Sequence, residues 1–137
     1  MKYSINSKFI KDLSFEIPTA ETFLMLEKEI QKYNLTFDIN SKQLKKNIIE
    51  VNTILKMTTK EKVDRKINVE INLTALVTIE GDLQDKESLE KIILIKVPTD
   101  IYPELYDTFI FLFSRSGIKN INIDKNIDFE KLYSQKK

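Results

Sequence analysis

The chain has 137 residues, of which 42% are hydrophobic and 31% are charged, with two glycines and three prolines. This balance is typical of a single globular domain spanning residues 1–137 and excludes a disordered chain. The 22 basic and 21 acidic residues leave a formal net charge of +1, which gives no strong field for attracting nucleic acid.

Cysteine and histidine are both absent from the sequence. The chain therefore has no disulfide, and it lacks the usual ligands of zinc, copper and haem iron. It also lacks the imidazole that activates serine and cysteine nucleophiles, so carboxylates, lysine and tyrosine are left for proton transfer. Two separated glycines cannot build a phosphate-binding loop. These absences predict a protein that is not an enzyme and binds neither a cofactor nor a metal.

No stretch approaches the roughly 20 consecutive apolar residues that a membrane-spanning helix needs. The first residues also lack the apolar core and the cleavage-like site of a signal peptide. We therefore expect a cytoplasmic protein that does not insert into a membrane.

The first predicted element is a strand over residues 9–17, which ends at Pro18. Successive side chains of a strand point to opposite faces. One face is predicted to hold Phe9, Leu13, Phe15 and Ile17, and the other Asp12, Ser14 and Glu16. Asp12 and Glu16 thus share the open face, each about 7 Å from Ser14 between them, because a strand rises about 3.3 Å per residue. From geometry alone, a solvated surface is the usual explanation of such acids.

Three more strands follow a segment, residues 19–32, that we expect to be irregular or briefly helical. The second strand is predicted over residues 33–44, the third over 49–57 and the fourth over 67–80. In the fourth, every odd position from 67 to 79 is apolar and almost every even position is polar. This alternation predicts a long antiparallel strand with one buried face.

Helical spacing appears in the second half of the chain. Residues 88–96 are predicted to be helical, with Ser88 as the N-cap and Pro98 as the stop. An extended conformation is the alternative for the largely β-branched run Ile92–Ile95. Residues 100–116 are predicted to form the principal helix, and Gly117 to end it in a left-handed conformation. Residues 118–123 are expected to be extended, and residues 128–134 to form a short closing helix.

Strands followed by helices predict an α+β fold: a four-stranded antiparallel sheet, a meander with a crossover, with helices packed on one face. The principal helix is more apolar than one sheet face can cover. The surplus indicates a subunit interface or a groove for a ligand.

The segment Lys11–Pro18, which reads KDLSFEIP, is similar to the first-strand signature of the SecB family of bacterial export chaperones. The resemblance continues in the same order through Leu35–Asp38, Gln43–Leu44, Ile49–Val51, Pro98, Tyr102–Pro103, Ser114–Gly117, Asp128–Phe129 and Leu132–Tyr133. It covers residues 9 to 133, and its ordered series is more specific than any single motif.

The resemblance implies a homotetramer, built as a dimer of dimers, that holds unfolded precursor proteins in apolar surface grooves without ATP or a cofactor. It also implies docking onto the translocation motor SecA through an acidic sheet face. The acids of that face match Asp12, Glu16 and Glu70, and all three lie at polar positions of their strands.

Client binding by such a chaperone needs apolar area without exact shape, and aromatic side chains supply it efficiently. The second strand and the surplus face of the principal helix offer such residues. The candidates are Tyr33, Leu35, Phe37, Tyr102, Tyr106 and Phe109. A core position is the alternative for each, and we expect about half of them to line a groove.

The chain departs from the family pattern at several positions. Asn68 stands where the family has an apolar residue, Thr74–Ala75 replaces a glycine pair, and the chain is neutral where relatives are acidic. The alternative is therefore a SecB-like chaperone dedicated to a specific partner, such as a toxin–antitoxin system. A carboxylate enzyme and a purely structural oligomerisation domain are hypotheses from other classes; the open position of the three acids argues against the enzyme.

Overall fold

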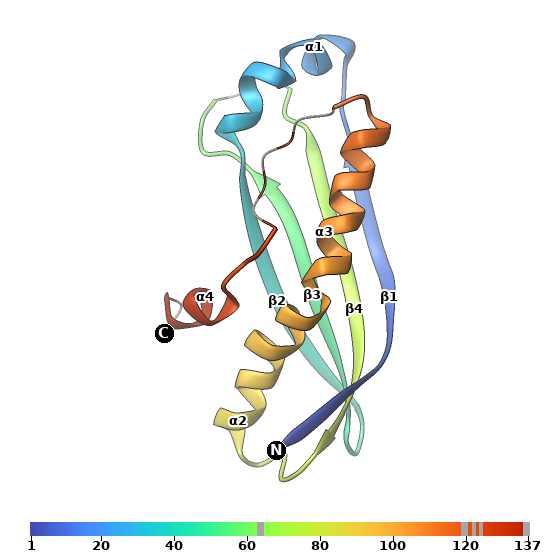
Figure 1. Ribbon diagram of the computed structural model, residues 1–137, viewed down its shortest axis with the longest axis vertical. Helices are drawn as coiled ribbons and strands as arrows, with labels where there is room; N and C mark the ends of the chain where they lie inside the picture. The colour runs from blue at the N-terminus through green and yellow to red at the C-terminus, as the bar shows by residue number, and fades with distance from the viewer. Residues whose placement is uncertain (63–64, 119–120, 122, 124, 136–137) are drawn as a thin grey trace.

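The computed structural model describes residues 1–62, 65–118, 121, 123 and 125–135, and it contains one four-stranded antiparallel sheet (Figure 1). The strands are β1 (Lys2–Glu16), β2 (Asn34–Lys45), β3 (Ile48–Thr58) and β4 (Asn68–Glu80), in the order β1-β4-β3-β2. Strands β2, β3 and β4 form a meander, and the chain crosses from one sheet edge to the other between β1 and β2. The predicted α+β fold is confirmed.

Helices cover one face of this sheet (Figure 1). Helix α2 (Lys86–Lys91) continues through a π-helical turn (Ile92–Lys96) into α3 (Val97–Arg115), and this long bent helix crosses the sheet diagonally. Helix α1 (Ala20–Glu29) and a 3-10 turn (Ile30–Lys32) lie at the end of the sheet where β2 begins, and α4 (Phe129–Gln135) lies beside β2. The face opposite α3 is called the outer face below.

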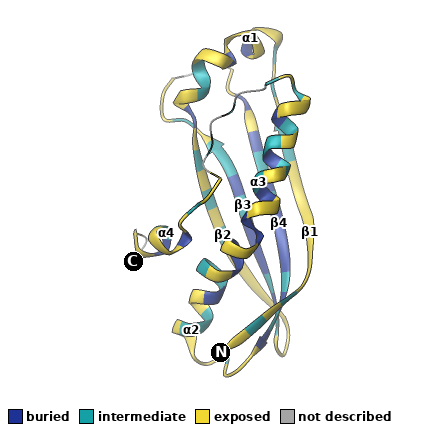
Figure 2. Cartoon of the chain, viewed as in Figure 1, coloured by how far each residue is buried: buried dark blue, intermediate teal, exposed yellow. Residues whose placement is uncertain are grey.

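The core lies between α3 and the central strands β3 and β4, which are the most deeply buried (Figure 2). The odd positions of β4 point toward the helices, as the alternation predicts, and Val69, Ile71, Ala75 and Val77 are at most 2% exposed. Phe109 and Phe113 of α3 pack onto this surface, and Phe113 meets Phe15 of β1 with ring centroids 4.9 Å apart. The edge strands β1 and β2 are much more exposed.

Strand β1 starts earlier than predicted and contains two irregularities. The register against β4 shifts between Ile5 and Ser7, and again between Ile10 and Asp12. Each bulge inserts one residue and so reverses which face the following side chains occupy. Phe9 therefore pairs with Thr74 on the outer face rather than sharing a face with Leu13, and its predicted position was wrong.

The helical prediction for residues 88–96 is corrected at both ends. Asp85 is the N-cap, because its carboxylate accepts the backbone N–H of Ser88 at 3.3 Å. Pro98 does not stop the helix: it lies in the first turn of α3, and the backbone before it stays helical through the π-helical turn. The π-helical turn directly before Pro98 widens the backbone where the proline ring would crowd the preceding turn.

The remaining elements follow the sequence closely. Gly117 has φ 84°, the left-handed conformation predicted for it, and α4 buries Phe129 and Tyr133. The extended segment expected over residues 118–123 falls partly outside the described residues, and Ile118, Ile121 and Ile123 are assigned to no strand. In the described part of the chain, no helix has the length and apolar character needed to span a membrane.

Candidate functional site

Two hollows follow the edge of the sheet along β2, one with a mainly apolar lining and one with a mixed lining. The first, of about 300 Å³, lies between β2, α4 and the π-helical turn. Its walls are formed mainly by Leu35, Phe37, Ile39, Leu94, Phe129 and Leu132. The second, of about 740 Å³, has a mixed lining: the polar Glu27, Gln31 and Asn34 border it together with apolar and aromatic residues that include Ile30, Tyr33, Leu35, Met57, Ile123 and Ile127. Leu35 borders both, so the hollows form one edge groove along β2.

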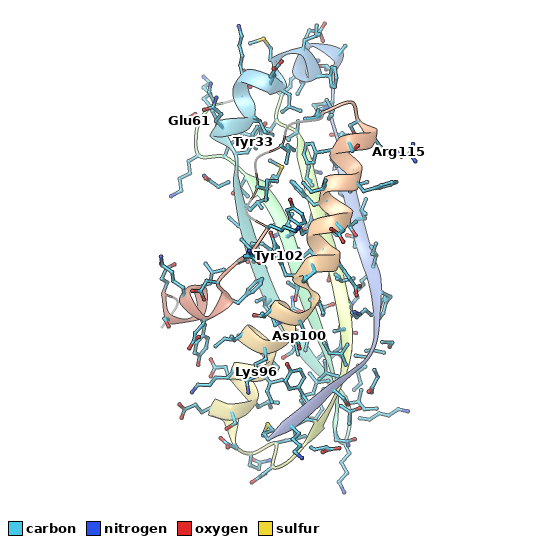
Figure 3. The ribbon with its side chains drawn as sticks, in the orientation of Figure 1. Tyr33, Glu61, Lys96, Asp100, Tyr102 and Arg115 are labelled. Atoms are coloured by element: carbon cyan, nitrogen blue, oxygen red, sulfur yellow. The ribbon has the colours of Figure 1, made fainter. Side chains whose placement is uncertain are left out.

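Two residues that line the first hollow, Phe37 and Phe129, belong to an aromatic cluster. The ring of Phe37 lies 5.8 Å from that of Tyr102 and 5.3 Å from that of Phe129, both near edge-to-face. Tyr102 and Phe129 lie 5.9 Å apart, and Tyr106 lies 6.2 Å from Tyr102. Tyr102 sits centrally on α3 and points toward the β2 side of the molecule (Figure 3). Such offset contacts stabilise the cluster beyond simple burial and hold α4 against the sheet.

The six candidate client-binding residues separate into two groups. Tyr33, Leu35 and Phe37, from β2 and the residue before it, border the edge groove. Tyr33 is nevertheless only 8% exposed, and its hydroxyl accepts the backbone N–H of Ile67 at 3.1 Å.

The three candidates from the helix border neither of the two hollows. Tyr102 is 3% and Phe109 1% exposed, so both belong to the packed core of the single chain, and Tyr106 is half-buried. Their part in client binding stays a prediction.

Residues that the sequence did not single out complete the groove. Leu94 comes from the π-helical turn, and Phe129 and Leu132 come from α4. The helical spacing of residues 129, 132 and 133 indicated that they point inward, but it did not indicate toward which strand. That information requires knowing that α4 packs beside the edge strand β2.

The three predicted docking acids share the outer face. Asp12, Ser14 and Glu16 pair with Asn72, Glu70 and Asn68, so Glu70 lies across from the position between the two acids of β1. Diagonal neighbours on one face of an antiparallel pair are about 7–8 Å apart at their Cα atoms. Asp12 and Glu16 are exposed, and the Glu70 side chain is 38% exposed. The structure therefore places the three acids together.

One of these acids, Glu70, forms an ion pair with a lysine of the same chain. The Lys56 ammonium lies 3.4 Å from Glu70 on β4 and 3.1 Å from Asp38 on β2. The hydrogen bond and charge of Asp38, followed by those of Glu70, raise the pKa of Lys56 above its ordinary value. Lys56 alternates along β3 with the apolar Leu55 and Met57 and so lies on the outer face, whereas its pairing with Glu70 depends on the order of the strands.

A ladder of polar side chains crosses the middle of the outer face. The Thr74 hydroxyl donates to Asn52 at 2.6 Å, and the Asn52 amide donates to Asn40 and to Glu50, both at 2.9 Å. Lys11, at the second bulge of β1, reaches across to Glu50 at 3.0 Å. The Asn52 and Lys11 contacts hold the pKa of the Glu50 carboxyl below its usual range. The ladder satisfies Asn52 and Thr74, which are at most 4% exposed.

The described residues hold no group of three or more carboxylates close enough to bind a metal ion. The three acids of the outer face are thus spread across a surface rather than gathered around a point. Such a surface suits attraction of a cationic partner. The edge groove, in contrast, suits contact with apolar segments of another chain.

Comparisons with known proteins agree with this architecture. The model of the family described as "Preprotein translocase subunit SecB" matches residues 1–137. The "Putative protein-export protein SecB" of Pelagibacter ubique is 43% identical over 134 residues, which cover 98% of this chain and 96% of that protein. The "Protein-export protein SecB" of Ralstonia nicotianae is 28% identical over 134 residues, which cover 98% of this chain and 75% of that protein.

A solved structure supports the fold. A SecB-like chaperone of Mycobacterium tuberculosis, solved in complex with a peptide from an antitoxin, superposes with a TM-score of 0.60. The alignment covers 89% of each chain at 12% sequence identity, so this likeness concerns the fold alone. Sequence and architecture together show that the chain belongs to the SecB family of protein-export chaperones.

Proposed function

We propose that the protein is an ATP-independent holdase of the cytoplasm that binds unfolded precursor proteins along the edge groove and passes them to the motor SecA. The observation that carries this proposal is the apolar hollow between β2 and α4, which shares Leu35 with a larger, mixed hollow beside an exposed edge strand. An extended client segment contributes apolar side chains to such hollows and backbone groups to the free strand edge.

The groove proposal predicts loss of holdase activity when its apolar wall is made polar. Leu132 of α4 lines the groove, whereas its neighbour Lys131 is exposed. Leu132→Ser is expected to raise severalfold the amount of chaperone needed to suppress aggregation of a chemically unfolded client, and Lys131→Ser to leave it near wild type. Light scattering without ATP measures both, and circular dichroism confirms folding. Wild-type protein that never suppresses aggregation contradicts the holdase role.

The handoff proposal assigns SecA binding to Asp12, Glu16 and Glu70 on the outer face. Charge reversal by Asp12→Lys together with Glu16→Lys is expected to abolish SecA binding while client binding in the edge groove is retained. The reason is spatial: the acids lie on the outer face, and the groove lies along the other edge of the sheet at β2. Calorimetric titration of each variant with SecA measures the loss, and equal loss of client binding would contradict the separation.

A second candidate partner is supported by the charge of the outer face. Two of its carboxylates, Glu50 and Glu70, are paired with lysines of this same chain. The structurally similar mycobacterial protein was solved with an antitoxin peptide. A chaperone dedicated to such a partner is therefore the alternative to SecA. Copurification of one discrete partner, with no SecA binding by the wild type, would favour it.

A further inference from the structure

Lys56 makes the outer face of this chain different from a simple acidic surface. Its ammonium is shared between Asp38 at 3.1 Å and Glu70 at 3.4 Å, so it already occupies one of the three proposed docking acids. No lysine or arginine of the described residues forms such a pair with Asp12 or Glu16. A cationic partner therefore meets two available carboxylates and one that must first release a lysine.

Asp38 is a second ion-pair partner of Lys56. The Asp38 side chain is 59% exposed and lies closer to the ammonium than Glu70 does. When a partner takes Glu70, the ammonium keeps the Asp38 contact and loses only one of two exposed ion pairs. An exposed ion pair contributes little free energy, because water and salt screen it. The exchange is therefore easy, but it still weakens each cationic contact at Glu70.

We infer that Lys56 is a specificity-determining residue of the outer face: it competes with a cationic partner for Glu70, and Asp38 retains it when the partner is bound. The inference rests on the proposed docking function of the outer face. It means that a partner presenting a neutral hydrogen-bond donor at Glu70 is favoured relative to one presenting a cation there.

The test is a double-mutant cycle between positions 56 and 70, with SecA as the probe at low ionic strength. Lys56→Gln is expected to tighten binding by about twofold to fivefold, the range of an exposed charge pair. In a Glu70→Gln background there is no carboxylate for Lys56 and the partner to compete for. Lys56→Gln is therefore expected to change SecA affinity much less in that background. An equal gain in both backgrounds would show a long-range charge effect and overturn the inference.

Two controls remove the same charge elsewhere. Lys42 lies on the outer face, where it pairs with Glu50 of β3. Thr36 is the residue of β2 that pairs with Lys56, and Lys42 lies six residues further along that strand, or about 20 Å away. Lys91 pairs with Glu87 on α2, on the helical side. Lys42→Gln and Lys91→Gln are both expected to change affinity less than Lys56→Gln does. A gain as large from either control would overturn the specific role of Lys56.

A second probe separates this inference from the proposed handoff. A short synthetic peptide of lysine and arginine is titrated into isotopically labelled protein, and the amide signals of Asp12, Ser14 and Glu16 are followed. Stronger peptide binding by Lys56→Gln supports the inference even where SecA does not bind, a result that overturns only the handoff. Unchanged peptide binding overturns the inference, whatever SecA does.

Discussion

The hydroxyl of Tyr3 ties the first strand to the start of the principal helix. It donates to Asp100 Oδ2 at 2.6 Å, and the pair joins residues 97 positions apart in the chain. Burial, the hydrogen bond to Asp100 and the negative charge of that carboxylate raise the pKa of Tyr3 to about 12. The raised pKa means that the folded state holds the phenolic proton more tightly than the unfolded chain does.

This contact predicts a pH dependence of stability with a definite sign. The contribution of Tyr3 is complete below pH 10, the value near which an unfolded tyrosine ionises, and it is lost as the pH rises toward about 12. Wild type is therefore expected to be more stable than Tyr3→Phe at pH 8, with the difference shrinking between pH 10 and 12. Urea unfolding at several pH values measures it, and a constant difference contradicts the assignment.

Individual residues show which positions could be predicted from the sequence alone. Alternation predicted polar strand positions for the acids at 12, 16 and 70, the family resemblance implied that they share one face, and the structure brings them together. Phe9 was misplaced, because a bulge changes the face without changing the residue pattern. The pairing of Lys56 with Glu70 was not predictable, because it needs the strand order β4-β3-β2 as well as the alternation within each strand.

Elements with strong periodicity were predictable, and their junctions were not. Strand β4 matches its prediction within one residue, because fourteen alternating positions determine both its length and its buried face. The junction between α2 and α3 was predicted wrongly. Pro98 was predicted to end the first helix, whereas the helix continues through it and Pro98 lies in the first turn of α3. Of the edge groove, only the residues from β2 and the position before it were predicted. The rest was not, because the groove forms where β2, the π-helical turn and α4 meet.

Helix α4 depends on its anchor, which leads to a prediction about the groove. The helix has seven residues, too few to be stable alone, and Phe129 fixes it by packing against Phe37 and Tyr102. Phe129→Ala is expected to release α4 and expose the groove, with the sheet intact. Faster proteolysis within residues 125–135 and stronger binding of an apolar dye would show this.

The exposed neighbour Glu130 provides the control for that experiment. Glu130→Ala keeps the aromatic anchor and is expected to behave as wild type. If Phe129→Ala were cleaved no faster than Glu130→Ala, the aromatic cluster would not be what holds α4 in place. Urea unfolding of Phe129→Ala shows whether the whole protein is destabilised as well. Truncating a buried phenylalanine costs about 3–5 kcal/mol, and a loss of that size in global stability would shift the whole urea transition.

At the scale of the whole molecule, the exposed apolar side chains of the described residues include a group on α1, formed by Phe23, Leu24 and Met25, and two further surfaces that are candidates for contact between chains. One lies on the long edge strand β1, where Phe9 on the outer face is 44% exposed, and Ile10 and Leu13 on the helix-covered face are 49% and 38% exposed. The other lies on α3, where Phe111 is 55% exposed with Arg115 5.2 Å above its ring. A free edge strand with exposed apolar residues favours pairing with another chain. A dimer of dimers has two kinds of interface, and we assign the β1 and α3 surfaces to them as a prediction.

This division predicts that the proposed tetramer comes apart in steps. Phe111→Glu places a charge on the α3 surface and leaves β1 unchanged, so it is expected to yield dimers rather than monomers, because burying an unpaired carboxylate is strongly unfavourable. Phe111→Leu keeps an apolar contact and is expected to remain tetrameric. Sedimentation velocity measures both masses. A Phe111→Glu protein that stays tetrameric would place the second interface away from α3, and a monomeric one would mean that β1 does not pair alone.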